Sequence, residues 1–89
     1  MSNTQWSVYM LRCVDNSLYT GITTDIERRV AEHNAGDVLA AKYTRSRRPV
    51  DLVYSELVSS RAEAAKREYA IKRLSKSAKE ALISQQEYI

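Results

Sequence analysis

Two short apolar runs joined by a turn constrain the fold of this chain most strongly. The first run covers residues 6–13 and the second covers 18–22, and both are rich in residues that favour strands. Between them, Asp15 and Asn16 tolerate the positive φ angles that tight turns require. The two runs therefore predict a β-hairpin at the start of the chain.

A helix is predicted directly after the hairpin. Thr24 and Glu27 have the spacing of a capping box, with Thr24 at the N-cap and Glu27 three residues later. The predicted helix runs from about residue 25 to 35 and ends at Gly36, a residue that commonly terminates helices. Residues 37–48 show no clean period and are basic, which predicts a loop.

The remainder of the chain predicts one strand and two helices. Pro49 opens a third apolar run over residues 50–58. Two further capping boxes, at 60–63 and 77–80, predict a helix to about residue 74 and a short terminal helix. The predicted order is β-β-α-β-α-α, an α+β fold.

Length and composition narrow the class of protein. A chain of 89 residues allows one small domain, which we expect to span 1–89 with a core over about 6–83. We expect neither a signal peptide nor a membrane segment, because no long apolar run is present. The single cysteine cannot form an internal disulfide, which favours a cytoplasmic protein.

Charge is distributed unevenly along the chain. Residues 42–79 contain 11 basic and 4 acidic residues, whereas the remainder contains 3 basic and 7 acidic residues. This segregation favours a basic face that binds a polyanion. A solvated Lys/Arg surface without a partner explains the pattern about equally well.

The helix predicted at 25–35 carries polar residues at the border of its apolar face. At 100° per residue, Ile26, Val30 and His33 share one sector, and Arg29 lies at its edge, four residues before His33. One interpretation is an arginine whose stem covers the core beside a buried, hydrogen-bonded histidine. The other is a cation and an imidazole that line a functional cleft.

A second residue that departs from its local pattern is Glu68. In the helix predicted at 62–74, it lies among Ala64, Ala65 and Ile71, where a carboxylate needs a partner. Lys72, four residues later, offers a simple ion pair. A metal ion or a basic active-site residue is the functional alternative.

Other chemistries find little support in the sequence. One Cys and one His do not make a Cys/His zinc site, and no nucleophile elbow accompanies the histidine. No Gly-rich phosphate loop is present. Tyr9 and Tyr19 fall on the two hairpin strands, where a cross-strand aromatic pair is their simplest interpretation. Cys13 reads as a strand residue.

These features together resemble the GIY-YIG nuclease domain. The first half-motif corresponds to residues 8–10 and the second to 19–21, although Ser7 and Val8 replace the leading Gly-Ile and Thr20 replaces the Ile of YIG. The helix with an Arg and a His-Asn pair one turn later follows, at 26–34. Segments 41–44, 47–50 and 67–72 resemble small stand-alone bacterial members of the family.

The resemblance implies a three-stranded antiparallel sheet flanked by helices, and it implies roles at matching positions. Glu68 matches the single metal-binding Glu, which implies Mg²⁺ or Mn²⁺ as cofactor. Arg29 matches the catalytic Arg, Tyr9 and Tyr19 match the two motif tyrosines, and His33 matches the following His. Whichever tyrosine acts as base needs a lowered pKa, because a phenol with a pKa of about 10 is a poor base at neutral pH.

The implied function is a metal-dependent, weakly specific DNA endonuclease that acts in DNA repair or turnover. RNA is not excluded as substrate, and a partner protein is expected to supply targeting, because well-characterised members usually carry a separate DNA-targeting domain. The expected nucleic-acid contacts are Lys42, Arg45, Arg47, Arg48 and Lys72. The competing hypothesis is a binding module that retains the fold without catalysis. Its expected phosphate contacts are Lys42, Arg45, Arg47, Arg48, Lys66, Arg67, Arg73, Lys76 and Lys79.

Overall fold

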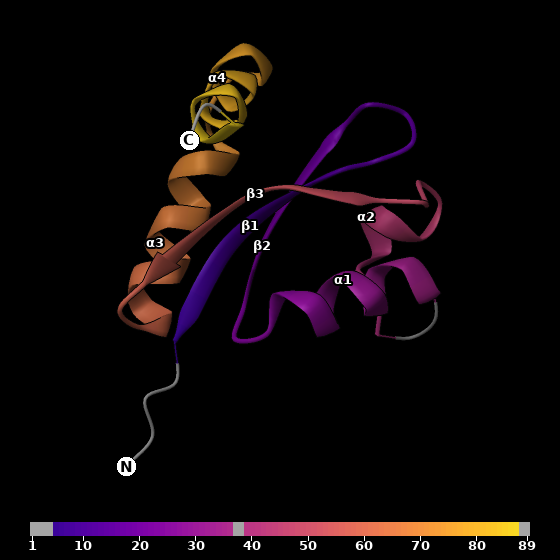
Figure 1. Cartoon of the computed structure of the whole chain (residues 1–89), viewed down its shortest axis with the longest axis horizontal. Helices are drawn as coiled ribbons and strands as arrows, with labels where there is room; N and C mark the ends of the chain where they lie inside the picture. The colour runs from indigo at the N-terminus through magenta and orange to yellow at the C-terminus, as the bar shows by residue number, and fades with distance from the viewer. Residues whose placement is uncertain (1–4, 37–38, 88–89) are drawn as a thin grey trace.

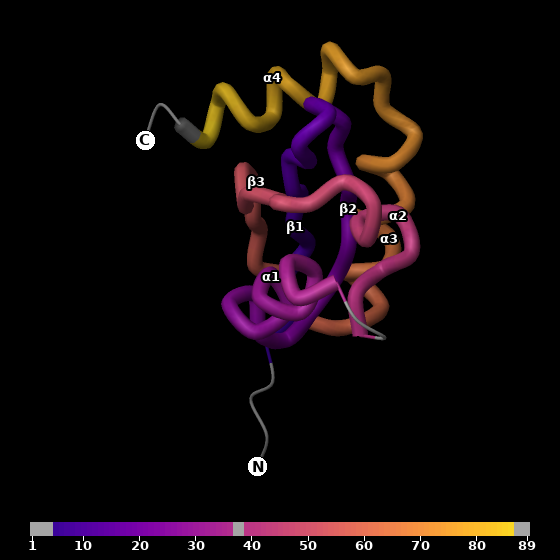
Figure 2. Tube along the Cα trace, turned by 90° about the vertical axis from the view of Figure 1, so that its right-hand side faces the viewer, coloured from indigo at the N-terminus to yellow at the C-terminus, as the bar shows by residue number. Residues whose placement is uncertain are grey.

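A three-stranded antiparallel sheet forms the centre of the molecule. The computed structural model describes residues 5–36 and 39–87. Strands β1 (Trp6–Arg12) and β2 (Leu18–Thr23) form the predicted hairpin, and β3 (Asp51–Val58) pairs with the other edge of β1. The strand order is therefore β2-β1-β3, which Figure 2 shows from the side.

Strand register decides which hairpin residues share a face of the sheet. Tyr9 pairs with Gly21, and Leu11 pairs with Tyr19. Because directly paired residues of antiparallel strands point to the same side, both tyrosines lie on one face, on diagonal positions. Met10 belongs to the opposite face, since successive side chains of a strand alternate.

Helices cover both faces of the sheet. Helices α1 (Ile26–Ala35) and α2 (Lys42–Arg45) lie on the face of the tyrosines, whereas α3 (Arg61–Lys72) and α4 (Lys76–Glu87) lie on the other (Figure 1). The expected α+β fold and element order are confirmed. The one-turn helix α2 falls in the segment predicted as a loop, since four residues are too few to show a helical period.

Each face of the sheet has its own apolar cluster. On the α3/α4 side, the buried residues are Val8, Met10, Tyr54, Ala64, Ile71 and Ile83. On the α1 side, they are Tyr9, Leu11, Cys13 and Val50. The second cluster is small and contains the phenol of Tyr9, so polar side chains of the helices on this face can hydrogen-bond the phenol.

Local hydrogen bonds explain where the helices begin. At α1, the N-cap is Asp25 rather than Thr24: its carboxylate accepts a bond of 3.1 Å from the Arg28 N–H, and its backbone is extended. At α3, Ser60 caps the helix as predicted, accepting from the Glu63 N–H.

The ends of the remaining elements differ by one to three residues from the prediction. Helix α4 begins at Lys76, because the Ser75 hydroxyl, not that of Ser77, accepts from the Ala78 N–H. With 12 residues, α4 is also longer than the short helix predicted. Strand β1 ends at Arg12, so Cys13 lies buried just beyond it instead of within it.

Two turn predictions are confirmed by backbone geometry. Asn16 in the hairpin turn has a φ of 69°, and Gly36 ends α1 with a φ of 72°. Both values lie in the left-handed region that Asn and Gly tolerate best. None of the helices in the described residues has the length and apolarity needed to cross a membrane.

Candidate active site

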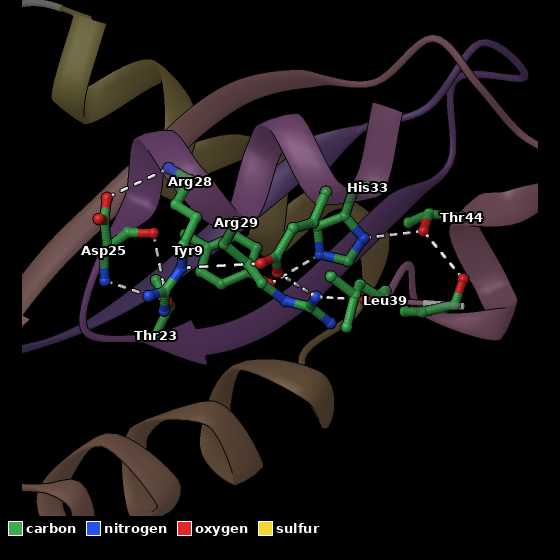
Figure 3. Close-up of polar contacts among 10 residues, drawn as sticks. Tyr9, Thr23, Asp25, Arg28, Arg29, His33, Leu39 and Thr44 are labelled. Atoms are coloured by element: carbon green, nitrogen blue, oxygen red, sulfur yellow. Dashed lines mark hydrogen bonds and ion pairs between the residues drawn. The ribbon is translucent and has the colours of Figure 1, made fainter. Parts of the chain in front are cut away.

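A buried hydrogen bond joins the first motif tyrosine to the histidine. The Tyr9 hydroxyl lies 2.9 Å from His33 Nε2, and both side chains are almost fully buried between β1 and α1 (Figure 3). The register places Tyr9 on the α1 face of the sheet, and the helical period places His33 on the inner side of α1. The structure therefore brings together two predicted site residues that are 24 positions apart.

Burial keeps both partners of this bond neutral near pH 7. It lowers the pKa of His33 to about 4, and the positive charge of Arg29 adds to this effect. Burial also raises the pKa of Tyr9 to about 12, with a further contribution from Tyr19, while Arg29 acts in the opposite direction. In this state Tyr9 is a phenol, so Arg29 and His33 alone do not supply the lowered pKa that a base requires.

Arg29 lies beside this bond and is held by several partners. Its guanidinium bonds the Glu32 carboxylate at 2.9 Å and the Leu39 carbonyl oxygen (Figure 3). It also donates to the Tyr9 hydroxyl, which lowers the pKa of that group. About a quarter of the side chain is exposed, so the guanidinium can still meet a ligand from solvent.

The second tyrosine belongs to an aromatic cluster that reaches the surface. The Tyr19 ring lies 5.2 Å from His33 and 6.4 Å from Tyr9, measured between ring centroids. On its outer side it stacks on Tyr43 of α2 at 6.0 Å. The Arg47 guanidinium covers the Tyr43 ring at 4.0 Å.

A glycine makes room for the first tyrosine. A Cβ atom at Gly21 would lie 2.5 Å from the Tyr9 hydroxyl oxygen, well inside van der Waals contact. The Gly of the second half-motif is therefore required by the close approach of the phenol to the backbone of β2.

Glu68 lies on α3, which covers the face of the sheet opposite α1 and contacts β1 and β2. A quarter of its side chain is exposed, and its carboxylate pairs with Lys72 at 3.3 Å. The simple ion pair considered for Glu68 is thus present. The negative charge of Glu68 also raises the pKa of Tyr9, as the smallest of the effects on that group.

The protein offers few ligands for a divalent cation, so substrate oxygens and water would have to complete its coordination shell. Among residues 5–36 and 39–87, no three His, Cys, Asp or Glu residues gather to hold a metal. Mg²⁺ commonly binds one or two carboxylates and fills its shell with water and phosphate oxygens. Glu68 alone fits that requirement, and the Lys72 ammonium is the group a cation would displace.

The five basic residues expected to contact nucleic acid have different surroundings. Lys42 is exposed, and half of the Lys72 side chain is exposed beside Glu68. Arg47 bonds Asp15 at 3.1 Å, and Arg48 donates to the carbonyl oxygens that end α1. Both arginines thus already stabilise the fold. An open cavity of about 540 Å³ lies alongside, lined by Asn34, Arg45, Ser46, Arg48 and Pro49.

Two polar residues of the site were missed by sequence reasoning. Thr44 Oγ1 lies 2.8 Å from His33 Nδ1, the second ring nitrogen. The Asn34 amide bonds both the N–H and the carbonyl oxygen of Val50, at 2.8 and 3.1 Å, and so fixes α1 to the start of β3. The one available signal was that both residues fall in segments that resemble the family.

A three-stranded sheet with a phenol on β1, a guanidinium on α1 and a carboxylate on α3 defines a small α+β domain. The family model described as the GIY-YIG catalytic domain matches residues 5–81, so the chain belongs to the GIY-YIG family.

Curated relatives are small proteins of similar length. The chain is 56% identical over 82 residues to UPF0213 protein DP2720 of Desulfotalea psychrophila, covering 92% of this chain and 74% of that protein. It is 59% identical over 75 residues to UPF0213 protein VNG_2274C of Halobacterium salinarum, covering 84% and 95%. Similar proteins thus occur in bacteria and archaea.

Solved structures share the fold. The NMR structure of UPF0213 protein BH0048 from Bacillus halodurans is 46% identical, with a TM-score of 0.58 and coverage of 91% of this chain and 84% of that one. The NMR structure of EF2693 from E. faecalis is 39% identical, with a TM-score of 0.64 and coverage of 100% and 94%.

Proposed function

We propose that this protein is a divalent-metal-dependent endonuclease that hydrolyses DNA phosphodiester bonds with weak sequence specificity. Membership of a nuclease family supports this reaction class. The observation that carries the proposal is the buried hydrogen bond between Tyr9 and His33 with the Arg29 guanidinium beside it. A cellular role in DNA repair or turnover follows from the substrate.

The proposed roles follow from the chemistry of each side chain. Tyr9 orients the attacking water, and His33 accepts a proton from Tyr9 at Nε2. Arg29, which is always charged, stabilises the negative charge that builds on the phosphoryl oxygens. Tyr19 packs against the His33 ring and limits access of bulk water to it.

Glu68 is the proposed ligand for Mg²⁺ or Mn²⁺. When bound, such a cation supplies positive charge at the phosphoryl oxygen and the leaving 3′ oxygen. Glu68 would hold the cation through its carboxylate, and Lys72, released from its ion pair, would then be able to meet a neighbouring phosphate.

A nicking assay tests the proposal. Purified protein is incubated with supercoiled plasmid and Mg²⁺ or Mn²⁺, and open-circle product is followed on a gel. We expect Glu68→Gln and Arg29→Ala each to lower the nicking rate by about 100-fold or more, the loss typical when one group that stabilises transition-state charge is removed. Activity that both variants retain in full would contradict the proposal.

The chain offers matched controls for both variants. Arg28 is next to Arg29, is more exposed and pairs with the same Glu32, and Glu63 lies in the same helix as Glu68 and pairs with Lys66. Arg28→Ala and Glu63→Gln therefore remove a comparable charge outside the site. We expect both to nick plasmid at nearly the original rate.

A binding module without catalysis remains the second candidate, and a specific observation favours it. Burial raises the pKa of Tyr9 to about 12, so Tyr9 is a phenol near neutral pH, and the Glu68 carboxylate pairs with Lys72. A pure binder would retain DNA or RNA affinity in Glu68→Gln and would cleave neither substrate under any divalent metal. Matched DNA and RNA oligonucleotides in the same assay identify the preferred nucleic acid.

A further inference from the structure

A continuous chain of hydrogen bonds runs from the site into α2. It leads from the Tyr9 hydroxyl to His33 Nε2, from His33 Nδ1 to Thr44 Oγ1, and from the Thr44 hydroxyl to the Ala41 carbonyl oxygen (Figure 3). The three distances are 2.9, 2.8 and 3.0 Å. Thr44 is fully buried, like His33, so water does not offer these groups other partners.

The last bond sets the direction of the others. A carbonyl oxygen only accepts hydrogen bonds, so the Thr44 hydroxyl donates its single hydrogen to the Ala41 carbonyl oxygen. Thr44 Oγ1 can then only accept from His33, which requires a hydrogen on Nδ1. A neutral imidazole has one N–H, so Nε2 is an acceptor and the Tyr9 hydroxyl donates to it.

We infer that Thr44 is a positioning residue that holds His33 in the Nδ1–H tautomer, so that Tyr9 donates its proton to His33 and keeps one oxygen lone pair for the attacking water. This inference rests on the proposed function. The other lone pair of the Tyr9 oxygen accepts from Arg29. With the opposite tautomer, Nε2–H would donate to the Tyr9 oxygen, and the phenol would lose both its proton acceptor and its remaining lone pair.

The proton transfers of the hydrolysis step balance with this arrangement. The Tyr9 oxygen takes a proton from water while the Tyr9 proton passes to His33 Nε2. The water oxygen bonds to phosphorus, the bond from phosphorus to the 3′ oxygen breaks, and the leaving oxygen takes a proton from solvent. His33 becomes an imidazolium whose Nδ1–H still bonds Thr44, and it later releases the Nε2 proton.

Charges around His33 act on this step in opposite directions. Arg29 disfavours the imidazolium, whereas Glu32 favours it. Tyr9 and Tyr19 contact it from the sheet through the edges and faces of their rings. A bound phosphate adds negative charge beside Arg29 and so offsets the cation that disfavours the imidazolium.

NMR tests the tautomer without any need for activity. His33 is the single histidine of the chain, so a long-range ¹H–¹⁵N spectrum of the imidazole at pH 7 reports on this residue alone. We expect Nδ1–H in the original protein and in Thr44→Ser. In Thr44→Val, which has nearly the same shape but no hydroxyl, we expect the Nε2–H tautomer to gain population.

Thr20→Val is the control for loss of a buried hydroxyl. Thr20 is a buried threonine of β2 on the opposite face of the sheet, and we expect its replacement to leave the His33 tautomer unchanged. An Nε2–H tautomer in the original protein, or an unchanged Nδ1–H tautomer in Thr44→Val, would overturn the inference.

Kinetics separate this inference from the proposed function. We expect kcat for nicking to fall about 10- to 100-fold in Thr44→Val, as for other residues that orient a functional histidine, with KM little changed and with recovery in Thr44→Ser. Equal kcat in the original protein and in Thr44→Val would overturn the catalytic part. Absence of nicking by the original protein would instead remove the proposed function, and the tautomer result would stand.

Discussion

His33 illustrates how burial determines the chemistry of a single residue. Its ring is inaccessible to water, each ring nitrogen has one hydrogen-bond partner, and Arg29 lies nearby. A charged imidazole would lose hydration here without gaining a close carboxylate at either nitrogen. The neutral form is therefore favoured, and His33 is the buried, hydrogen-bonded histidine of the first interpretation.

This burial makes folding stability depend on pH. The pKa of His33 falls from 6.5 to about 4 on folding, so the unfolded chain binds more protons between these values. Stability from this group is present above about pH 6.5 and is lost as pH falls toward 4, by on the order of 3 kcal/mol. Urea unfolding at pH 7 and pH 4.5 measures the loss. His33→Gln is the reference variant. An equal loss of unfolding free energy between pH 7 and pH 4.5 in that variant would show that carboxylates alone cause the pH dependence.

Gly21 determines whether the phenol can lie where it does. A methyl group at this position would meet the Tyr9 hydroxyl, so Gly21→Ala should push the ring off its bond with His33. We expect a loss of about 1–3 kcal/mol in stability, typical of overpacking, together with reduced nicking. Tyr9→Phe in the same background removes the closest atom but leaves ring carbon Cζ 2.7 Å from the added Cβ, so we expect only part of the lost stability to return. Unchanged stability in Gly21→Ala would contradict the clash.

Among the elements, β3 is held in place by two side-chain amides. The Asn34 amide of α1 bonds the backbone N–H and carbonyl of Val50 just before the strand. The Gln86 amide of α4 bonds the same two groups of Ser55 in the strand, at 3.0 and 2.7 Å. Both amides take the place of a neighbouring strand at the outer edge of the sheet.

The two amides differ in burial, which gives a matched pair of variants. Val50 is buried, so Asn34→Ala leaves two backbone groups without water or partner and should cost about 2–3 kcal/mol. The Gln86 bonds are exposed to solvent, so Gln86→Ala should cost less than about 1 kcal/mol. Thermal unfolding compares them. An equal loss of unfolding free energy in both variants would contradict the explanation that burial sets the cost of losing these bonds.

Across the whole molecule, the basic surplus lies in the segment from α2 to the start of α4. This segment supplies Lys42, next to Tyr43 of the aromatic cluster, and Lys72, which pairs with Glu68. Other basic residues of the segment serve the fold, as Arg48 does at the end of α1. The charge surplus thus divides between structural bonds and cations available to a polyanion.

DNA binding should therefore weaken with salt. If about five phosphates are contacted, the slope of log K against log[salt] should be about −4 to −5 for duplex DNA. Lys42→Ala should reduce the magnitude of this slope by about 1, whereas Arg28→Ala, outside the expected contact set, should leave it unchanged. Fluorescence anisotropy without divalent metal measures both. A slope near zero would exclude a phosphate-dominated interface.

The sequence predicted the elements well and their ends less well. The hairpin, Gly36 and the Ser60 cap follow from local chemistry, and each is present. Asp25 and Ser75 cap helices α1 and α4 instead of the expected Thr24 and Ser77. Neighbouring polar residues compete for the same backbone N–H groups, and the direction of the backbone decides which side chain can accept from them. For the site, the resemblance identified Tyr9, Arg29 and His33, which the structure brings together.

What the sequence by itself determined was the order of strands and helices and the residue types able to do phosphodiester chemistry, because periodicity, caps and turns act over a few residues. What the tertiary structure alone decided was which groups meet: the approach of Tyr9 to Gly21, the hydrogen bond from Tyr9 to His33, and the bonds from His33 through Thr44 to Ala41. These depend on strand register and on packing between distant segments, and burial there sets the pKa values that local sequence does not reveal.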